Sequence, residues 1–360
     1  SSSRQSHESS SLARSCRDKR ASRPVREALG IRGRGRSTTV ERALVDFGAE
    51  ESLGHAAKRF EEHYGFDVGR TSVLRVVEGY AEQAKEYVAQ RLTAARKDYQ
   101  VPVARRPGVD AMLVELDGCN IRTGWLEPAN DDSVTEVRQI PRQRRVEAWR
   151  EVRIGLARDL DKADPTYVGR MASYPEVVRD MFSAATEQGM SRRTQVYGVG
   201  DGGNGLREEL QVQFPRLTYV LDWCHLKGHL TESAQAMGLE DVARPFWVSD
   251  AMGLVAAGRA HRLVSELRGV QDEGADRALR CAGYLERFAS GTNYDELRDK
   301  GIPIGSGEVE SAHRHIPQKR LKLPGAWWKP ETIEPMLALR VVRANDWWGD
   351  FWQKRHKVAA

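Results

Sequence analysis

The chain has 360 residues, of which 30% are charged, and it carries a formal net charge of +5. No apolar run approaches the ~20 residues that a membrane-spanning helix needs, which excludes a transmembrane protein and predicts a soluble one. The four cysteines are far apart and form no CxxC pair, so neither a zinc ribbon nor a disulfide framework is predicted, and a reducing cytoplasm is favoured.

Positive charge is concentrated at the two ends of the chain. Residues 1–40 contain ten Lys or Arg against three acids, and residues 314–358 contain ten against four, which leaves the middle of the chain acidic. This distribution favours a polyanionic partner whose phosphates would bind at the basic ends. A basic tail combined with a solvated helix face would give the same charge pattern.

The N-terminal hundred residues divide into a tail and a helical unit. Residues 1–38 are rich in Ser, Arg and Gly and lack Phe, Tyr and Trp, so we expect a disordered basic tail. This tail has no apolar core of the kind that a secretory signal requires. From residue 39 to residue 100, apolar residues recur at spacings of three and four, which predicts a small helical domain.

Residues 52–80 of this helical domain resemble a helix-turn-helix. They offer an Ala-rich helix, a turn at Gly65 and a second helix with Arg70 and Arg75 on its outer face. We therefore predict that Arg70 and Arg75 contact DNA. A plain helical hairpin with a glycine turn fits the same residues equally well.

Three apolar runs rich in β-branched residues predict strands. AMLVELDGCNI predicts a strand that ends at Asp117, VYGVGDGG one that ends at Asp201, and TYVLDWCHL one that ends at Asp222. Helical stretches lie between these runs. The alternation of strands and helices predicts an α/β sheet.

The α/β core is predicted to be interrupted. Residues 108–237 form its first part, and residues 238–300 carry helical patterns without strand signals, as an inserted helical unit would. Residues 301–355 return to the core with a helix that begins after the GSG motif at 305–307 and carries Glu310.

Three acidic residues share one kind of setting in this arrangement. Asp117 and Asp201 each end an apolar strand just before a glycine, and Glu310 opens a helix after a glycine turn. A single Asp at a strand end is ordinary turn chemistry. Several carboxylates on neighbouring elements would repel one another unless a cation lay between them. Oxygen ligands without a suitable Cys/His set favour Mg²⁺ or Mn²⁺, and two such ions are the arrangement that promotes phosphodiester displacement.

A family resemblance is carried by motifs that follow one another in order: ELDGCNIR, VYGVGDGG with YVLDWCHLKGHL, IPIGSGEVESAHRHIPQKRLKLPGAWW, and PMLALRVVRANDWW. With these motifs, residues 40–355 resemble the bacterial insertion-sequence DDE transposases of the Kra type, which are related to the Mutator-like group. The resemblance implies an RNase H-like mixed sheet with flanking helices, interrupted by a helical insertion. It also implies DNA partners, namely element ends and target, with a homo-oligomer on the DNA.

The resemblance implies a catalytic, metal-binding triad made of Asp117, Asp201 and Glu310, which would hold two Mg²⁺ or Mn²⁺ ions. Glu310 is preferred to Glu308 because the acid of the family precedes Ser-Ala-His, as it does here. The expected reaction is cleavage of a DNA strand by water, followed by attack of the freed 3′-hydroxyl on target DNA.

A second family element, Asp or Cys, then any two residues, then His, is matched by the segment from Asp222 to His225. The resemblance implies that His225 and this Asp orient the scissile phosphate or a metal-bound water, a supporting role rather than ligation. Alternatively, His225 and His229 lie four residues apart on a predicted helix and could hold zinc.

The basic residues after Glu310 are predicted to neutralise phosphates that flank the reacting bond; they are His313, Arg314, Lys319, Arg320 and Lys322. A solvated helix face is the alternative for this run. Trp327 and Trp328 could stack on an unpaired base next to the break, although tryptophans at such spacing also suit a protein core.

Two other functions remain open from the sequence. The chain could be a DNA-binding regulator or inactive relative, in which the acids merely finish strands, or a metal-dependent nuclease that cleaves without joining. Neither a membrane nor a small-molecule substrate is expected, and the location would be cytoplasmic, associated with the nucleoid.

Overall fold

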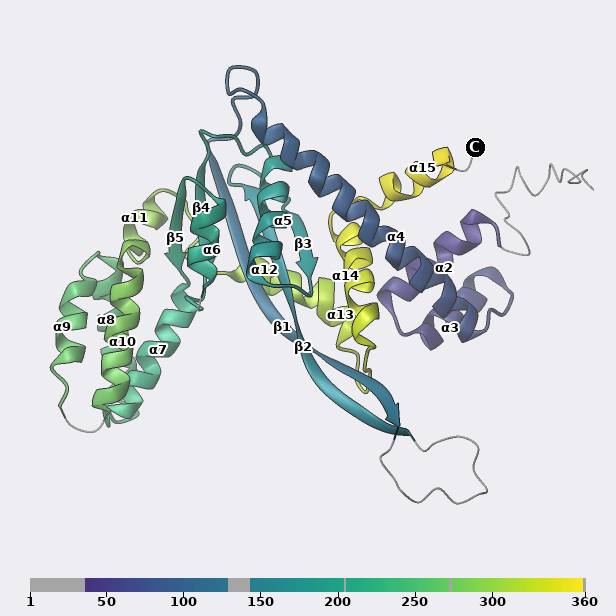
Figure 1. The fold of residues 1–360 in the computed structure, drawn as a ribbon. Coiled ribbons are helices and arrows are strands. Elements are labelled where there is room, and N and C mark those ends of the chain that lie inside the picture. Colours follow the sequence, from purple (N-terminus) through teal and green to yellow (C-terminus); the bar gives the residue numbers. More distant parts are fainter. Residues whose placement is uncertain (1–35, 129–142, 204, 272–273, 359–360) are drawn as a thin grey trace, which may run out of the picture.

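The structure is a computed structural model that describes residues 36–128, 143–203, 205–271 and 274–358, with side chains described up to residue 354. The predicted tail therefore lies almost wholly outside the described residues. Figure 1 shows a central sheet with one group of helices at the N-terminal side and another beyond β5. In the described part of the chain, no helix combines the length and the apolar character needed to cross a membrane.

From residue 36 onward, the helices before the sheet are α2 (Thr38–Glu50), α3 (Leu53–Tyr64) and α4 (Arg70–Lys97), with the short 3-10 turn η1 (Asp98–Gln100) after them. The core elements that follow are β1 (Ala111–Pro128), β2 (Gln143–Asp159), β3 (Thr166–Arg170), α5 (Tyr174–Glu187), β4 (Gln195–Gly200), α6 (Leu206–Gln213), β5 (Leu217–Leu221) and α7 (Trp223–Ala236).

The next elements are helical: α8 (Arg244–Ala256), α9 (Ala260–Arg268), α10 (Ala275–Phe288), η2 (Ala289–Gly291) and α11 (Tyr294–Asp299). The last elements are α12 (Gly307–His313), the π-helical turn η3 (Arg314–Gln318), α13 (Lys319–Leu321), α14 (Pro330–Ala344) and α15 (Trp348–Val358).

The sheet has five strands in the order β3-β2-β1-β4-β5. β2 runs antiparallel to both of its neighbours, whereas β1, β4 and β5 run parallel to one another. Helix α5 packs on one face of the sheet, and α12 and α14 pack on the other. The predicted α/β class is confirmed as a mixed sheet with flanking helices.

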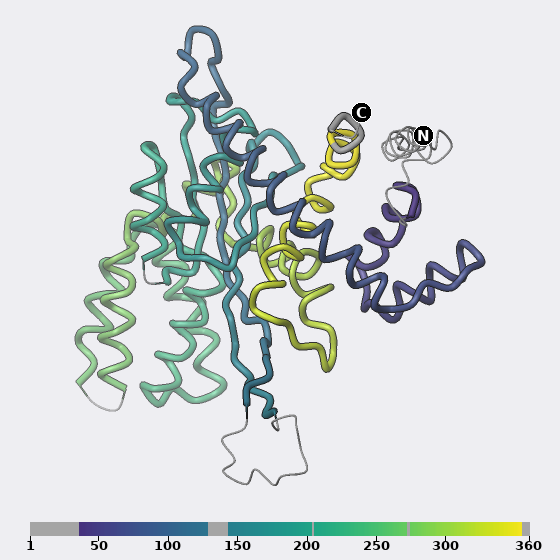
Figure 2. The backbone as a smooth tube through the Cα atoms, turned by 45° about the vertical axis from the view of Figure 1, so that its right-hand side comes forward, coloured from purple at the N-terminus to yellow at the C-terminus, as the bar shows by residue number. Residues whose placement is uncertain are grey.

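Strand β1 does not end at Asp117-Gly118, as the sequence predicts, but continues to Pro128. The reason is pairing with β2, which runs without a break from Met112 opposite Asp159 to Pro128 opposite Gln143. The turn preference of Asp-Gly is overridden because a ladder partner satisfies the backbone beyond it. Figures 1 and 2 show the outer part of the two strands projecting beyond the sheet as a ribbon.

The N-terminal helices begin and end where side-chain caps and glycine permit. Ser37 Oγ accepts a hydrogen bond from Val40 N at the start of α2, and Ser52 Oγ accepts one from His55 N at the start of α3. Gly65 ends α3 in the left-handed conformation, with φ of 74°. α4 is then a single helix of 28 residues.

A buried arginine, Arg340 on α14, ties the N-terminal helices to the C-terminal segment. Its guanidinium donates to the carbonyl oxygens of Ala49, His315 and Ile316 and forms an ion pair with Glu50 at the end of α2. Helix α14 also packs along α4. The helical unit and the end of the chain therefore share one core, although the sequence suggests separate domains.

We expect Arg340→Met to lower the free energy of unfolding by about 3 kcal/mol, because three carbonyls, two of them in buried hydrogen bonds, lose their donor. Arg343→Met is the matched control: Arg343 pairs with Asp46 from a position that is 30% exposed, so a loss below about 1 kcal/mol is expected. Urea unfolding followed by circular dichroism measures both. Equal losses in the two variants would contradict the role given to Arg340.

Candidate active site

The parallel register of β1 and β4 brings two of the predicted acids side by side. The last paired residues of the ladder are Glu115 and Val199, so the positions two residues further along are Asp117 and Asp201. Neighbouring strands lie about 4.8 Å apart, so the backbones of Asp117 and Asp201 are neighbours just beyond the end of the ladder. The Asp117 side chain is 46% exposed and Asp201 is also exposed.

The loop that carries Asp201 is held by two tyrosines. The hydroxyl of Tyr284, from α10, donates to the carbonyl of Asp201 at 2.6 Å, and the hydroxyl of Tyr219, from β5, accepts from Gly202 N at 3.1 Å. Gly202 has φ of 75°, and a Cβ there would lie 2.7 Å from Tyr284 Oη. The glycine after Asp201 is thus required by this close approach. Neither tyrosine contact could be predicted from the sequence, because each joins residues of different elements that only the fold brings together.

Glu310 is brought to the sheet by a buried carboxylate, Asp222. Asp222 is 1% exposed; its Oδ1 accepts from His225 N at 2.8 Å and caps α7, while its Oδ2 accepts from Ser306 N at 2.6 Å and Ser306 Oγ at 2.8 Å. Ser306 Oγ lies 3.4 Å from Glu310 Oε1. The expected role of Asp222 at the phosphate or the water does not fit, because its two oxygens are already bonded inside the protein.

The two candidate glutamates of α12 have different surroundings. Glu308 forms a two-point ion pair with Arg158 of β2, at 2.9 Å from Nε and 2.6 Å from Nη2. Glu310 is exposed, and within the described residues no Lys or Arg lies at ion-pair distance from it. This contrast favours Glu310 as the acid that is free to bind a cation, with Glu308 fixing α12 to the sheet.

A further acid, Glu115, lies beneath the site and was missed by the sequence analysis. It is fully buried on β1, two residues before Asp117 and therefore on the same face, and its Oε2 accepts from Val309 N of α12 at 2.8 Å. Burial raises the pKa of Glu115 to about 8. The sequence marks Glu115 only as a charged residue inside an apolar run, AMLVELDG.

The histidines at and near the site have different surroundings. His313 is 3% exposed and its Nε2 lies 3.4 Å from Asp117 Oδ2, so it faces the acids and not a DNA phosphate. Burial lowers the pKa of His313, although Asp117 acts in the opposite direction. His225 is exposed on the first turn of α7. The ring of His229 instead packs against Tyr284, with Arg277 at 3.1 Å from Nδ1.

The donor set of this site is chemically suited to a hard cation, since it consists of exposed or half-exposed carboxylates that pair with no Lys or Arg among the described residues. In the part of the chain that the structure describes, however, no three His, Cys, Asp or Glu side chains are close enough to hold one ion. The backbone of Asp117 and Asp201 is adjacent, but the side chains are not closed around a common point. The zinc alternative at His225 and His229 likewise has no third ligand among these residues.

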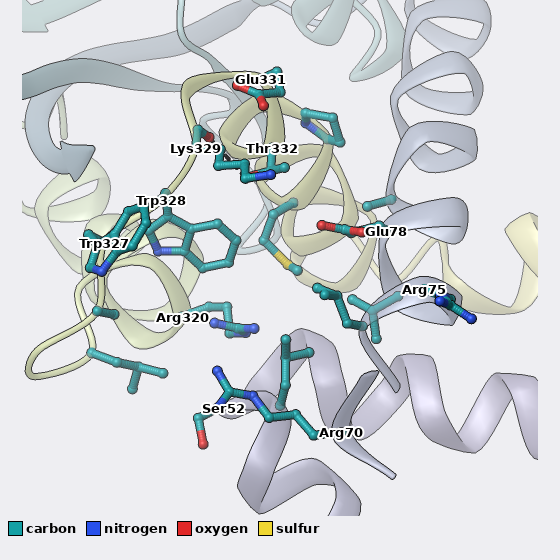
Figure 3. Close-up of a pocket in the computed structure, with 18 of the residues that line it drawn as sticks. Ser52, Arg70, Arg75, Glu78, Arg320, Trp327, Trp328, Lys329, Glu331 and Thr332 are labelled. Atoms are coloured by element: carbon teal, nitrogen blue, oxygen red, sulfur yellow. Dashed lines mark hydrogen bonds between the residues drawn. The ribbon is translucent and has the colours of Figure 1, made fainter. Parts of the chain in front are cut away.

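Several predicted DNA-binding residues line one groove of about 990 Å³ between the starts of α3 and α4 and the segment before α14. Figure 3 shows Arg70, Arg320, Trp327 and Trp328 on its walls, with Arg75 further along α4. Trp327 is 36% exposed, and the guanidinium of Arg145 lies 4.7 Å from its ring.

Arg320 corrects the prediction for the basic run after Glu310. It is 5% exposed, its Nε donates to the carbonyl of Gly48 at 2.9 Å, and its guanidinium lies over the ring of Trp328, so it is not available for a phosphate. Lys319 pairs with Glu50, whereas Arg314 and Lys322 are exposed. Lys322 interacts with Cys119, two residues after Asp117, which makes it the cation of this run next to the acids.

Comparison with protein-family models gives no match for this chain, and comparison with curated proteins gives no significant match.

A pH-dependent stability is expected from Glu115. Its pKa is raised on folding from the usual 4.5 to about 8, so the folded state binds the proton more tightly and its stability falls as pH rises through this window. Glu115→Gln mimics the protonated carboxyl. The stability of this variant relative to the unmodified protein should therefore increase between pH 5 and pH 8, by up to about 1.4 kcal/mol per pH unit.

Urea unfolding of both proteins at half-unit pH steps measures this difference, in which all other titrating groups cancel. A difference that stays constant across the window would show that Glu115 is ionised in the folded protein.

Proposed function

We propose that the chain is a DNA transposase that cleaves and joins strands with a divalent cation at Asp117, Asp201 and Glu310. The observation that carries the proposal is the β1–β4 register, which sets Asp117 beside Asp201 on adjacent parallel strands, with Glu310 on the helix that packs against β1. Three of the four ordered sequence motifs each contain one of these acids.

The topology supports an RNase H-like core for this chemistry. A mixed sheet carries the two aspartates, and helices α8–α11 lie between the strand β5 and the helix α12 that bears Glu310. A core with a helical insertion before its last acid needs this order of elements. The insertion also reaches the site, since Tyr284 of α10 bonds the backbone of Asp201.

Each acid near the site has its own role in the proposal. Glu115 and Asp222 are buried and Glu308 is paired with Arg158, whereas Asp201 and Glu310 are exposed, Asp117 is half-exposed, and none of these three pairs with a Lys or Arg among the described residues. Three like charges without basic partners are costly unless a cation compensates them. Two Mg²⁺ or Mn²⁺ ions bound there would activate the attacking oxygen and stabilise the leaving oxygen.

The DNA would approach along exposed basic residues. Lys322 is placed to neutralise a phosphate near Asp117, and Arg314 lies on the next turn after α12. Arg70 and Arg75 occupy the exposed first turns of α4, which supports the helix-turn-helix interpretation of α3 and α4. Trp327 offers a partly exposed ring between these two regions for an unpaired base. We infer that more than one copy acts on the paired element ends.

We expect Asp117→Asn and Asp201→Asn each to abolish Mg²⁺-dependent cleavage of a labelled duplex that carries the ends of the adjoining element. Each change removes a charge from the cation site while it preserves the shape of the side chain. Folding and DNA binding should persist, as checked by circular dichroism and by gel shift in a chelator. Mg²⁺-dependent cleavage by either variant would falsify the triad.

Glu308 and Glu310 form a matched pair on the same helix. Glu310→Gln should abolish cleavage with little effect on stability, because Glu310 is exposed. Glu308→Gln should leave cleavage largely intact but lower the free energy of unfolding by about 1–3 kcal/mol, because Arg158 loses its charged partner. Cleavage and urea unfolding are measured on both variants. The reverse ranking in cleavage would reject Glu310.

A second candidate function, DNA binding without catalysis, is favoured by the spacing of the acids, since no three candidate ligands among the described residues approach one point. A regulator of this kind binds DNA equally well in a chelator and never nicks it. A nuclease that cleaves DNA but cannot join strands is distinguished from a transposase by supplying a pre-cleaved 3′-hydroxyl end and assaying for joined product.

A further inference from the structure

His313 has the setting of a residue that acts through Asp117. It is the last residue of α12, three positions after Glu310, and its side chain is 4% exposed. Its Nε2 lies 3.4 Å from Asp117 Oδ2. Residues three apart lie on neighbouring parts of a helix surface, so α12 places both Glu310 and the partner of Asp117 at the same end of the sheet.

Both ring nitrogens of His313 are buried. Among the described residues, neither Nδ1 nor Nε2 of His313 has a hydrogen-bond partner of good geometry, although both atoms are buried. Buried polar atoms in proteins are normally bonded. An ionised carboxylate can only accept a hydrogen bond, so a hydrogen bond between Asp117 and His313 requires the proton on Nε2.

The Asp117 carboxylate contacts the protein through both oxygens and is also partly exposed to solvent. Its Oδ1 accepts from Gly118 N at 2.7 Å, and its Oδ2 faces His313, while nearly half of the side chain stays exposed. One carboxylate oxygen is thus held by a hydrogen bond and the other lies next to the imidazole of His313, which restricts the orientation of the side chain. Contacts with residues that do not themselves touch the metal set the orientation of a ligating carboxylate.

The backbone at His313 is locally specialised. The residue four positions on is Pro317, which has no N–H to donate to the carbonyl of His313, so an α-helical bond is impossible at this point. The chain instead enters the π-helical turn η3 immediately after His313. Buried Ile316 and Pro317 anchor this turn. π-turns inside helices frequently occur at functional sites.

We propose that His313 is a positioning residue that orients the carboxylate of Asp117 toward a divalent cation. This assignment rests on the proposed function, because it takes Asp117 as a ligand. It gives His313 a role different from the phosphate contact that the sequence suggests, and it explains why a histidine is buried beside an exposed acid.

The test is Mn²⁺ binding to the full chain, measured from the electron paramagnetic resonance signal of free Mn²⁺, without DNA. His313→Leu keeps the volume but removes the donor, and should weaken Mn²⁺ binding by about 10- to 100-fold. His313→Gln places an amide nitrogen near the position of Nε2 and should restore most of the affinity. His315→Leu is the control, because His315 packs on Tyr167 and not on Asp117, and it should bind as the unmodified protein does.

Thermal melting without metal shows whether each variant is folded. Should the Leu variant not fold, His313→Asn replaces it, since its shorter amide does not reach Asp117 and weak binding is expected. Unchanged affinity in the variant without the donor, or equal loss in that variant and the Gln variant, overturns the role of His313 and leaves the proposed function standing. Unchanged affinity in Asp117→Asn overturns both.

Discussion

The bonds of the buried Asp222 carboxylate hold together the parts of the protein that carry the candidate site. Asp222 follows β5 directly, caps α7 through His225 N, and accepts two hydrogen bonds from Ser306, more than eighty residues later in the chain. The contact Trp223 N to Ile304 O, at 2.9 Å, reinforces this junction. Because an ionised carboxylate is costly to bury without donors, these bonds fix the turn before α12 in one place. The position of Glu310 over the sheet follows from them.

The acidic residues around this junction fall into two groups that differ in burial and in bonding partners. Glu115 is buried and its pKa is raised by that burial, Asp222 is bonded on both oxygens, and Glu308 is neutralised by Arg158. Asp117, Asp201 and Glu310 keep exposed oxygens. The first group builds a rigid frame between the sheet and α12. The second group is left with the charge that a cation would compensate, and the aspartate loop is steadied by tyrosines from β5 and α10.

The basic residues of the C-terminal segment also fall into two groups, one buried and one exposed. Residues 314–358 form one positive cluster in the sequence, but Arg340 and Arg320 bond the carbonyls of Ala49 and Gly48 at the end of α2. These two side chains join the N-terminal helices to the last segment of the core. Exposed Lys322, by contrast, lies near Asp117. A positive cluster in this chain is therefore partly an internal framework and only partly a surface.

The sequence alone determined the α/β class and the helical character of residues 39–100, because hydrophobic periodicity and turn residues act locally. It also indicated that acidic residues lie close to strand ends. It placed Asp117 at a strand end, yet β1 continues for eleven more residues, since the partner strand β2 supplies the pairing that local preference cannot show. It also could not separate Glu308 from Glu310 by surroundings, or find Glu115, Tyr284 and the contact of His313 with Asp117. Those depend on burial and on partners distant in the chain, and only the tertiary structure decides which side chain meets which.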